Sequence, residues 1–212
     1  IGAPEQGKHN AQKLLMEQGI DWATLLRLAE YHNIRPQLAA LLRGMPEELV
    51  PDGVLDQLQA ANKVIAFRQM ANLRAFLQIQ ARLQDLGVVA VPFKGFVLGQ
   101  AVYPQFTQRE SWDIDLFIHP VVIDLVYPLM IELGYQPKAM YPAVSPLKLL
   151  QRYGEYNFSQ FNGEKRIFHV EFHATLGAPM QGLNITLAEL QAQVQNEDFH
   201  GRAMPFFSPS VQ

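Results

Sequence analysis

The chain has 212 residues, of which 49% are hydrophobic and 17% are charged, with a formal net charge of −3 and no cysteine. This length and composition suit a sizeable buried core, and the lack of cysteine excludes disulfides and thiolate metal sites. The net negative charge argues against nucleic acid as a partner, and no apolar run approaches the roughly 20 residues that cross a bilayer. We therefore expect a cytoplasmic protein that does not span a membrane.

The first part of the chain is predicted to be helical. We expect three short helices, near residues 8–18, 22–31 and 36–43. Asp21 is a suitable N-cap for the second of them. Residues 54–86 contain neither proline nor glycine and repeat apolar side chains at helical spacing, which predicts one helix of about 50 Å. We assign residues 1–86 to an N-terminal helical lobe.

A strand, a turn and another helix follow. Residues 87–93 are typical of a short buried strand, and Lys94-Gly95 then begins a helix that ends before Pro104. A helix N-terminus with a glycine can bind phosphate through its free N–H groups, and Lys94 adds a positive charge. Arg109 is a second candidate, because its guanidinium offers paired donors to phosphate oxygens. We predict that Lys94, Gly95 and Arg109 bind phosphate.

The segment from Trp112 to Ile118 contains the strongest functional signal. The apolar residues at positions 112, 114, 116 and 118 alternate with Asp113, Asp115 and Phe117. This pattern predicts a strand with both carboxylates on one face. Two like charges on a largely apolar strand repel each other unless a cation lies between them or water reaches them. Mg²⁺ prefers carboxylate oxygens and leaves positions for water and phosphate. Asp113 and Asp115 are therefore predicted metal ligands.

The rest of the chain is predicted to mix helices and strands. We expect helices at 120–134, 145–153 and 186–196, and strands at 156–161, 166–176 and 202–207, with Asn162-Gly163 as a hairpin turn. In the strand 166–176, Glu171 lies between His169 and His173 on one face, which brings a third carboxylate towards the aspartates. Residues 87–212 would form an α/β lobe. Ser208-Pro209 resembles the start of a further helix, so we expect the natural chain to continue beyond residue 212.

These motifs resemble a known family. Lys94-Gly95, Tyr103, Arg109 and Asp113-Ile-Asp-Leu116, in this order and spacing, are similar to the uncharacterised nucleotidyltransferase family of the DNA polymerase β-like superfamily. The resemblance extends from Trp22 to about Phe207 and includes Glu171-Phe172-His173. It implies an α+β fold, in which an N-terminal helical lobe is followed by a minimal nucleotidyltransferase-like mixed sheet flanked by helices. At the helix start, where the superfamily usually has Gly-Ser, this chain has Lys-Gly.

The resemblance implies magnesium-dependent transfer of an NMP group from an NTP to an acceptor, either a small molecule or a protein. Asp113 and Asp115 would hold Mg²⁺ on the triphosphate. Glu171 would complete a second metal position and help to deprotonate the acceptor. Lys94 and Arg109 would offset the charge of the phosphates.

A second function remains open from the residues alone. The chain could be a catalytically inactive regulatory module that binds a nucleotide or a metal. In that case His169, Glu171 and His173 are candidate ligands for a transition metal such as zinc, because imidazole and carboxylate groups alternate on one strand face. Stoichiometric, tightly bound zinc would favour this function, whereas weak magnesium binding that tightens with nucleotide would favour the transferase.

Overall fold

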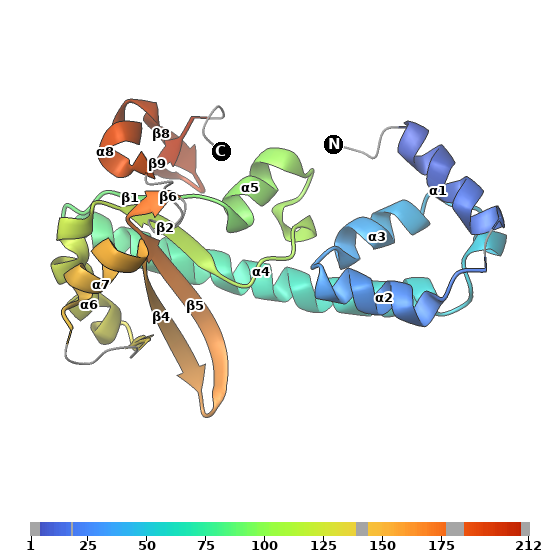
Figure 1. Cartoon of the computed structure of the whole chain (residues 1–212), viewed down its shortest axis with the longest axis horizontal. Helices are drawn as coiled ribbons and strands as arrows, with labels where there is room; N and C mark the ends of the chain where they lie inside the picture. Colours follow the sequence, from blue (N-terminus) through green and yellow to red (C-terminus); the bar gives the residue numbers. More distant parts are fainter. Residues whose placement is uncertain (1–4, 18, 139–143, 177–184, 209–212) are drawn as a thin grey trace. The chain divides into compact units, whose positions relative to one another are not determined.

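The computed structural model describes residues 5–17, 19–138, 144–176 and 185–208. The chain divides into two compact units, one comprising residues 1–71 and 98–111 and the other residues 72–97 and 112–212. The long helix α4 (Val54–Asp85), expected from the sequence, contributes to both units (Figure 1). The boundary at residue 86 that we expect from the sequence stays a prediction.

The first unit is helical. It contains α1 (Glu5–Glu17), α2 (Trp22–Tyr31), α3 (Arg35–Leu42), the short 3-10 helix η1 (Glu47–Leu49) and the first part of α4. The predicted cap is confirmed, because the Asp21 side chain accepts a hydrogen bond of 3.1 Å from the Thr24 backbone N–H. The core of the unit forms where α3 packs against the start of α4, through Ala39, Leu42, Val54 and Leu58.

Residues 98–111 complete this unit. They contain the end of α5 (Gly95–Val102) and the 3-10 helix η2 (Phe106–Gln108). Arg35 donates to the buried carboxylate of Glu110, and Gln69 Nε2 donates to the Ser111 carbonyl over 2.7 Å. These contacts fix the segment to α3 and α4.

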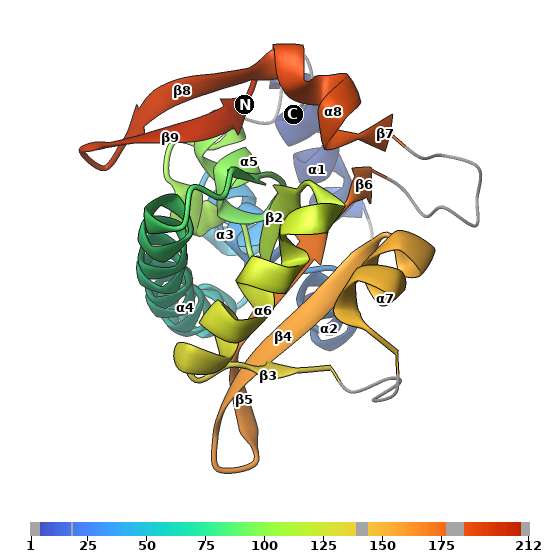
Figure 2. The same ribbon diagram turned by 90° about the vertical axis from the view of Figure 1, so that its left-hand side faces the viewer.

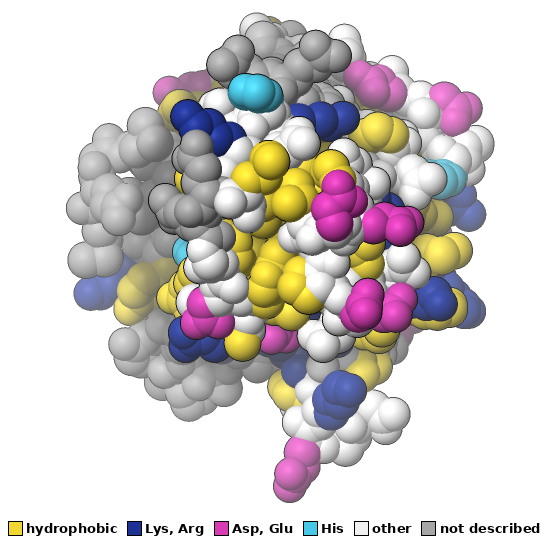
Figure 3. All heavy atoms as spheres, turned by 90° about the vertical axis from the view of Figure 1, so that its right-hand side faces the viewer, with side chains coloured by type: hydrophobic (Ala, Val, Ile, Leu, Met, Phe, Trp, Pro, Cys, Tyr) yellow, Lys and Arg dark blue, Asp and Glu magenta, His cyan; other side chains and the backbone are white. Residues whose placement is uncertain are grey.

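Several large hydrophobic side chains lie outside the core of the first unit. Figure 3 shows one side of the molecule, where hydrophobic side chains gather next to acidic ones. The exposed large hydrophobic residues of the first unit include Leu14, Met16, Leu28, Tyr31, Ile34, Val64, Phe67 and Met70. Because these side chains stay largely exposed, they contribute little hydrophobic free energy to the folding of this unit.

The second unit is organised around a five-stranded mixed sheet. In spatial order its strands are β1 (Ala90–Pro92), β2 (Ile114–Ile118), β5 (Lys165–His173), β4 (Glu155–Asn162) and β3 (Gln136–Pro137). Only the central pair, β2 and β5, is parallel among these strands, and the other neighbours are antiparallel. The predicted α+β fold with a mixed sheet is confirmed.

One face of this sheet is apolar and covered by helices. Tyr127 of α6 (Ile123–Glu132) packs against Phe158, which in turn packs edge-to-face against Phe172, with ring centroids 5.8 Å apart in both pairs. The helix α7 (Pro146–Tyr153), which Ser145 caps, lies on the same side (Figure 2). Because side chains alternate along a strand, this packing leaves Asp115, Glu171 and His173 on the opposite face.

The end of the polar face beyond Asp115 is closed by apolar residues. We expected Phe117 to share an open face with the carboxylates, but it is fully buried in a cluster with Val91, Phe93, Leu187 and Phe207. The cause is β9 (Arg202–Phe207), which lies beside β1 and covers this part of the sheet. The expected strand start is also wrong, because β2 begins at Ile114 and the side chain of Trp112 is exposed.

The helix predicted at 186–196 is mostly a strand. The capping box at Thr186 is present, but α8 (Leu187–Leu190) is followed by η5 (Gln191–Gln193) and then by β8 (Val194–Phe199). A two-residue turn at His200-Gly201 joins β8 to β9, and both turn residues have positive φ, at 53° and 79°. This is the backbone conformation that a type I′ hairpin requires.

Two further boundaries differ from the sequence prediction. Asn162 stays in β4 and pairs with Lys165, so the hairpin turn is Gly163-Glu164 instead of Asn162-Gly163. The strand β5 ends at His173, and β6 (Thr175–Leu176) pairs separately with β7 (Ile185–Thr186). The helix expected from Pro209 lies outside the described residues.

Candidate functional site

Three adjacent strands contribute polar side chains to the uncovered face of the sheet. In the parallel register of β2 and β5, Asp115 lies directly opposite Glu171. In the antiparallel register of β5 and β4, Glu171 lies opposite Asn157. Paired residues of neighbouring strands point to the same face, so the sheet brings Asp115 and Glu171 together as expected.

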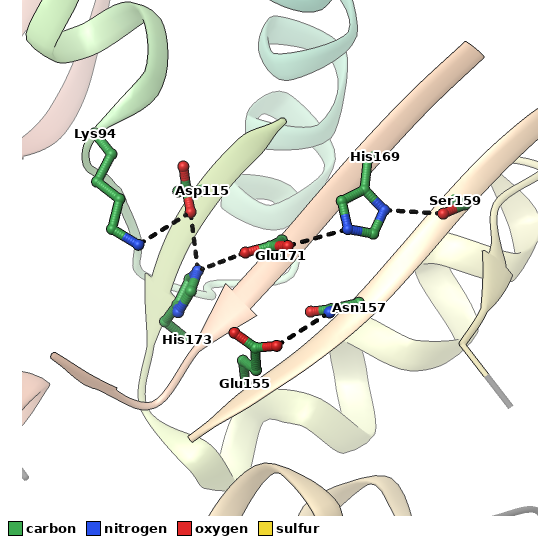
Figure 4. Close-up of polar contacts among 8 residues, drawn as sticks. All are labelled: Lys94, Asp115, Glu155, Asn157, Ser159, His169, Glu171 and His173. Atoms are coloured by element: carbon green, nitrogen blue, oxygen red, sulfur yellow. Dashed lines mark hydrogen bonds and ion pairs between the residues drawn. The ribbon is translucent and has the colours of Figure 1, made fainter. Parts of the chain in front are cut away.

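His173 lies between the two carboxylates (Figure 4). Its Nε2 is 3.0 Å from Asp115 Oδ1 and 3.4 Å from Glu171 Oε2, and the side chains of His173 and Asp115 are only 9% and 4% exposed. Burial lowers the pKa of His173, but hydrogen bonds to Asp115 and Glu171 outweigh burial, so the pKa of the ring is raised. The carboxylates of Asp115 and Glu171 thus face a ring that readily carries positive charge.

Glu171 also contacts a second histidine. His169 Nε2 is 3.0 Å from Glu171 Oε1, and His169 Nδ1 is 2.9 Å from Ser159 Oγ (Figure 4). The hydrogen bonds from His169 and then His173 hold the pKa of Glu171 well below its usual range, despite partial burial. Glu171 is therefore a carboxylate, held by imidazoles at both oxygens, and its low basicity favours binding a cation over accepting a proton.

Lys94 approaches the same group from the start of α5. Its Nζ is 3.5 Å from Asp115 Oδ1 and 4.7 Å from the centroid of the Phe93 ring, and the side chain is 53% exposed. Lys94 has a φ of +56°, in the left-handed region that non-glycine residues rarely adopt, and Gly95 follows with a φ of +43°. This tight turn between β1 and α5 places a solvent-accessible ammonium beside the buried Asp115.

Two other predicted residues lie outside the Asp115 group. Asp113 is half-buried and directly precedes β2, so strand pairing does not fix it. Arg109 follows η2 in the first unit, where its Cβ packs closely against Gly99. Their roles in metal and phosphate binding stay predictions.

The sequence alone did not pair His173 with Asp115. The alternation within β5 already places His173 on the face of Glu171. The missing information was the parallel register of β2 and β5, in which His173 lies opposite Phe117, two residue pairs beyond the pair of Asp115 and Glu171. From there the imidazole reaches back to the Asp115 carboxylate.

The donor atoms of this group fit a divalent cation. Asp115, Glu171 and His173 each offer one ligand atom, and these atoms lie within 4.8 Å of one another. Beside Glu171, Asn157 is buried, and its Oδ1 has no hydrogen-bond partner. An unpaired buried carbonyl oxygen is costly, and a nearby cation or its bound water would satisfy it.

Within the described ranges, no helix is both long enough and apolar enough to span a membrane.

Comparison with family models agrees with the motifs. The model of a family described as "Uncharacterised nucleotidyltransferase" matches residues 18–212. Among solved structures, a Thermotoga maritima protein described as a "putative nucleotidyltransferase" is similar, with 17% identity and a TM-score of 0.43 over 66% of this chain and 78% of that chain. No curated protein gives a significant match.

Proposed function

Because the chain belongs to the uncharacterised nucleotidyltransferase family, we propose that it is a magnesium-dependent enzyme that transfers an NMP group from an NTP to a small-molecule or protein acceptor. One observation carries the proposal above all. The parallel register of β2 and β5 sets Asp115 directly beside Glu171, with Lys94 at a helix N-terminus 3.5 Å from Asp115. Carboxylates on adjacent strands next to a cationic turn suit the recognition of a metal-bound triphosphate.

In this proposal, Asp113 and Asp115 hold the ion that accompanies the triphosphate, and Glu171 serves a second ion. The bound Mg²⁺ would neutralise charge on the phosphates and favour in-line displacement at the α-phosphorus. Lys94 Nζ is accessible enough to leave Asp115 for a phosphate oxygen. Arg109 would provide further positive charge for the leaving pyrophosphate.

Histidines maintain the geometry of the carboxylates. His169 holds Glu171 Oε1 while its other nitrogen contacts Ser159. Because Glu171 accepts the hydrogen bond, Nε2 of His169 donates it, and Nδ1 of the same ring lies 2.9 Å from Ser159 Oγ. This chain of contacts fixes the orientation of the Glu171 carboxylate.

A thermal-shift panel tests the proposal. ATP, GTP, CTP and UTP are each added with and without Mg²⁺, and we expect one nucleotide to raise the melting temperature only when Mg²⁺ is present. The matched control is Asp113→Asn, which should abolish that shift. If no NTP stabilises the wild-type protein under any metal condition, the proposal is wrong. If a nucleotide binds but no acceptor yields pyrophosphate, the inactive binding module replaces the transferase.

A further inference from the structure

We propose that Asp115, Glu171 and His173 bind a resident first-row transition-metal ion without nucleotide, and that the His173 imidazole is the ligand that selects this ion over Mg²⁺. The inference deepens the proposed function and rests on it in one respect: this ion would be the second of the two, distinct from the Mg²⁺ that arrives with the triphosphate at Asp113 and Asp115. This ion would be bound by the protein in the absence of substrate, and only the other ion would arrive with the triphosphate.

The separations of the ligand atoms match those around a small divalent ion. With bonds of about 2.1 Å, neighbouring ligands are roughly 3.0 Å apart in an octahedral shell and roughly 3.4 Å apart in a tetrahedral one. His173 Nε2 lies 3.0 Å from Asp115 Oδ1 and 3.4 Å from Glu171 Oε2. All three ligand atoms lie within 4.8 Å of one another, so one ion could reach them after side-chain adjustment, and it would replace the hydrogen bonds between the ring and the carboxylates.

The composition of the group favours a transition metal. Mg²⁺ prefers oxygen ligands and retains most of its water, whereas imidazole nitrogen is a good ligand for zinc and iron. His173 is buried, so its Nε2 can turn away from the carboxylates only at the cost of losing its partners. A magnesium ion here would lie next to an imidazole nitrogen, which is not its preferred ligand, whereas a transition-metal ion would bind that nitrogen.

The surroundings resemble the outer shell of a metal site. His169, whose other ring nitrogen contacts Ser159, holds Oε1 of Glu171, and Glu171 Oε2 lies 3.4 Å from His173 Nε2. Metal-binding carboxylates are commonly oriented by such hydrogen bonds. The buried Asn157 Oδ1, which lacks a partner, is an independent indication, because Asn157 is the strand neighbour of Glu171 on the same face. A fourth ligand or a metal-bound water would satisfy it.

Calorimetry without nucleotide tests this inference. The full chain is stripped with a chelator and titrated separately with Zn²⁺, Mn²⁺ and Mg²⁺. We expect one ion per chain, with affinity decreasing in that order, which is the order for a site that contains imidazole. His173→Gln should weaken Zn²⁺ binding at least tenfold and leave Mg²⁺ binding nearly unchanged. His119→Gln is the matched control for adventitious binding, because His119 is exposed and follows the far end of β2.

A second measurement covers the case in which His173→Gln does not fold. Pulsed electron paramagnetic resonance of Mn²⁺ bound to the wild-type protein should show coupling to an imidazole nitrogen, and its absence would overturn the inference. Equal affinities for Mg²⁺ and Zn²⁺ would also overturn it, as would zinc binding that depends on His119 instead of His173. Because none of these measurements contains a nucleotide, the resident ion can be established even if nucleotidyl transfer fails, and the reverse holds too.

Discussion

Nε2 of His173 lies 3.0 Å from Oδ1 of Asp115, although 58 residues separate them in the sequence. Lys94 approaches the same oxygen, so two basic side chains depend on one buried carboxylate. Asp115 therefore has a structural role that Asp113, which precedes the strand, need not share. This difference allows binding and stability to be separated by mutation.

We expect Asp113→Asn and Asp115→Asn to abolish magnesium-dependent nucleotide binding, whereas only Asp115→Asn should destabilise the protein substantially. Loss of the Asp115 charge leaves the buried His173 ring without its strongest acceptor, which costs about 1–3 kcal/mol in the free energy of unfolding. Calorimetric titration and urea denaturation of both variants measure the two effects. Unchanged magnesium–nucleotide affinity in both variants would remove the metal assignment.

Glu171→Gln should affect catalysis more than substrate binding. Asp113 and Asp115 would still hold the triphosphate-bound ion, so nucleotide affinity should stay within roughly a few-fold. Loss of the Glu171 carboxylate, the ligand of the second metal ion, should slow pyrophosphate release by about 10² or more, because this interaction matters mainly in the transition state. Affinity and single-turnover rate are measured on the same variant. A normal rate with saturating nucleotide would exclude Glu171 from catalysis.

Gly201→Ala should destabilise the β8–β9 hairpin through its backbone alone. Gly201 has a φ of +79°, and an added Cβ would meet no atom within 4 Å, so the expected loss of about 1 kcal/mol comes from the left-handed conformation. Gly19→Ala is the control, since that position is also open and needs no positive φ. Equal midpoints for the two variants in urea would contradict the type I′ turn.

Tyr135→Phe should reduce the loss of stability at alkaline pH. Burial raises the pKa of the Tyr135 hydroxyl from its ordinary value of 10.0 to about 12. Because the folded-state pKa is the higher one, the stabilisation is complete below pH 10 and is lost as pH rises towards 12. After allowance for partial solvent access, the wild type should lose about 1 kcal/mol more than the variant by pH 11. Parallel urea curves for the two proteins between pH 9 and 11 would show that Tyr135 ionises freely.

Local sequence signals were sufficient for the starts of helices, which depend on residues within a single helical turn. Asp21 was recognised as a cap, and Ser145 and Thr186 also cap the starts of two expected helices; each side chain accepts a hydrogen bond from a backbone N–H three residues later. The helix expected at 186–196 failed beyond that first turn. There, tertiary pairing with β9 prevailed over helical spacing, and the left-handed His200-Gly201 turn was not recognised.

The candidate site was only partly predictable for a related reason. Alternation identified the face that carries Asp115 and the face that carries Glu171, because it depends on each strand separately. The position of His173 against Asp115 depends on the register of two strands that are distant in sequence, which no local pattern specifies. The burial of Phe117 likewise depends on β9, a strand from the far end of the chain.

The parallel pairing of β2 with β5 also has a kinetic consequence. The chain between these strands forms α6, β3, α7 and β4, so the two halves of the acidic group meet only after a long loop has closed. Contacts of such high sequence separation form slowly, because the entropy of closure is lost before the contact contributes. During synthesis, Asp115 would leave the ribosome well before Glu171 and His173 exist to meet it. Acquisition of ligand binding should therefore mark a late step of folding.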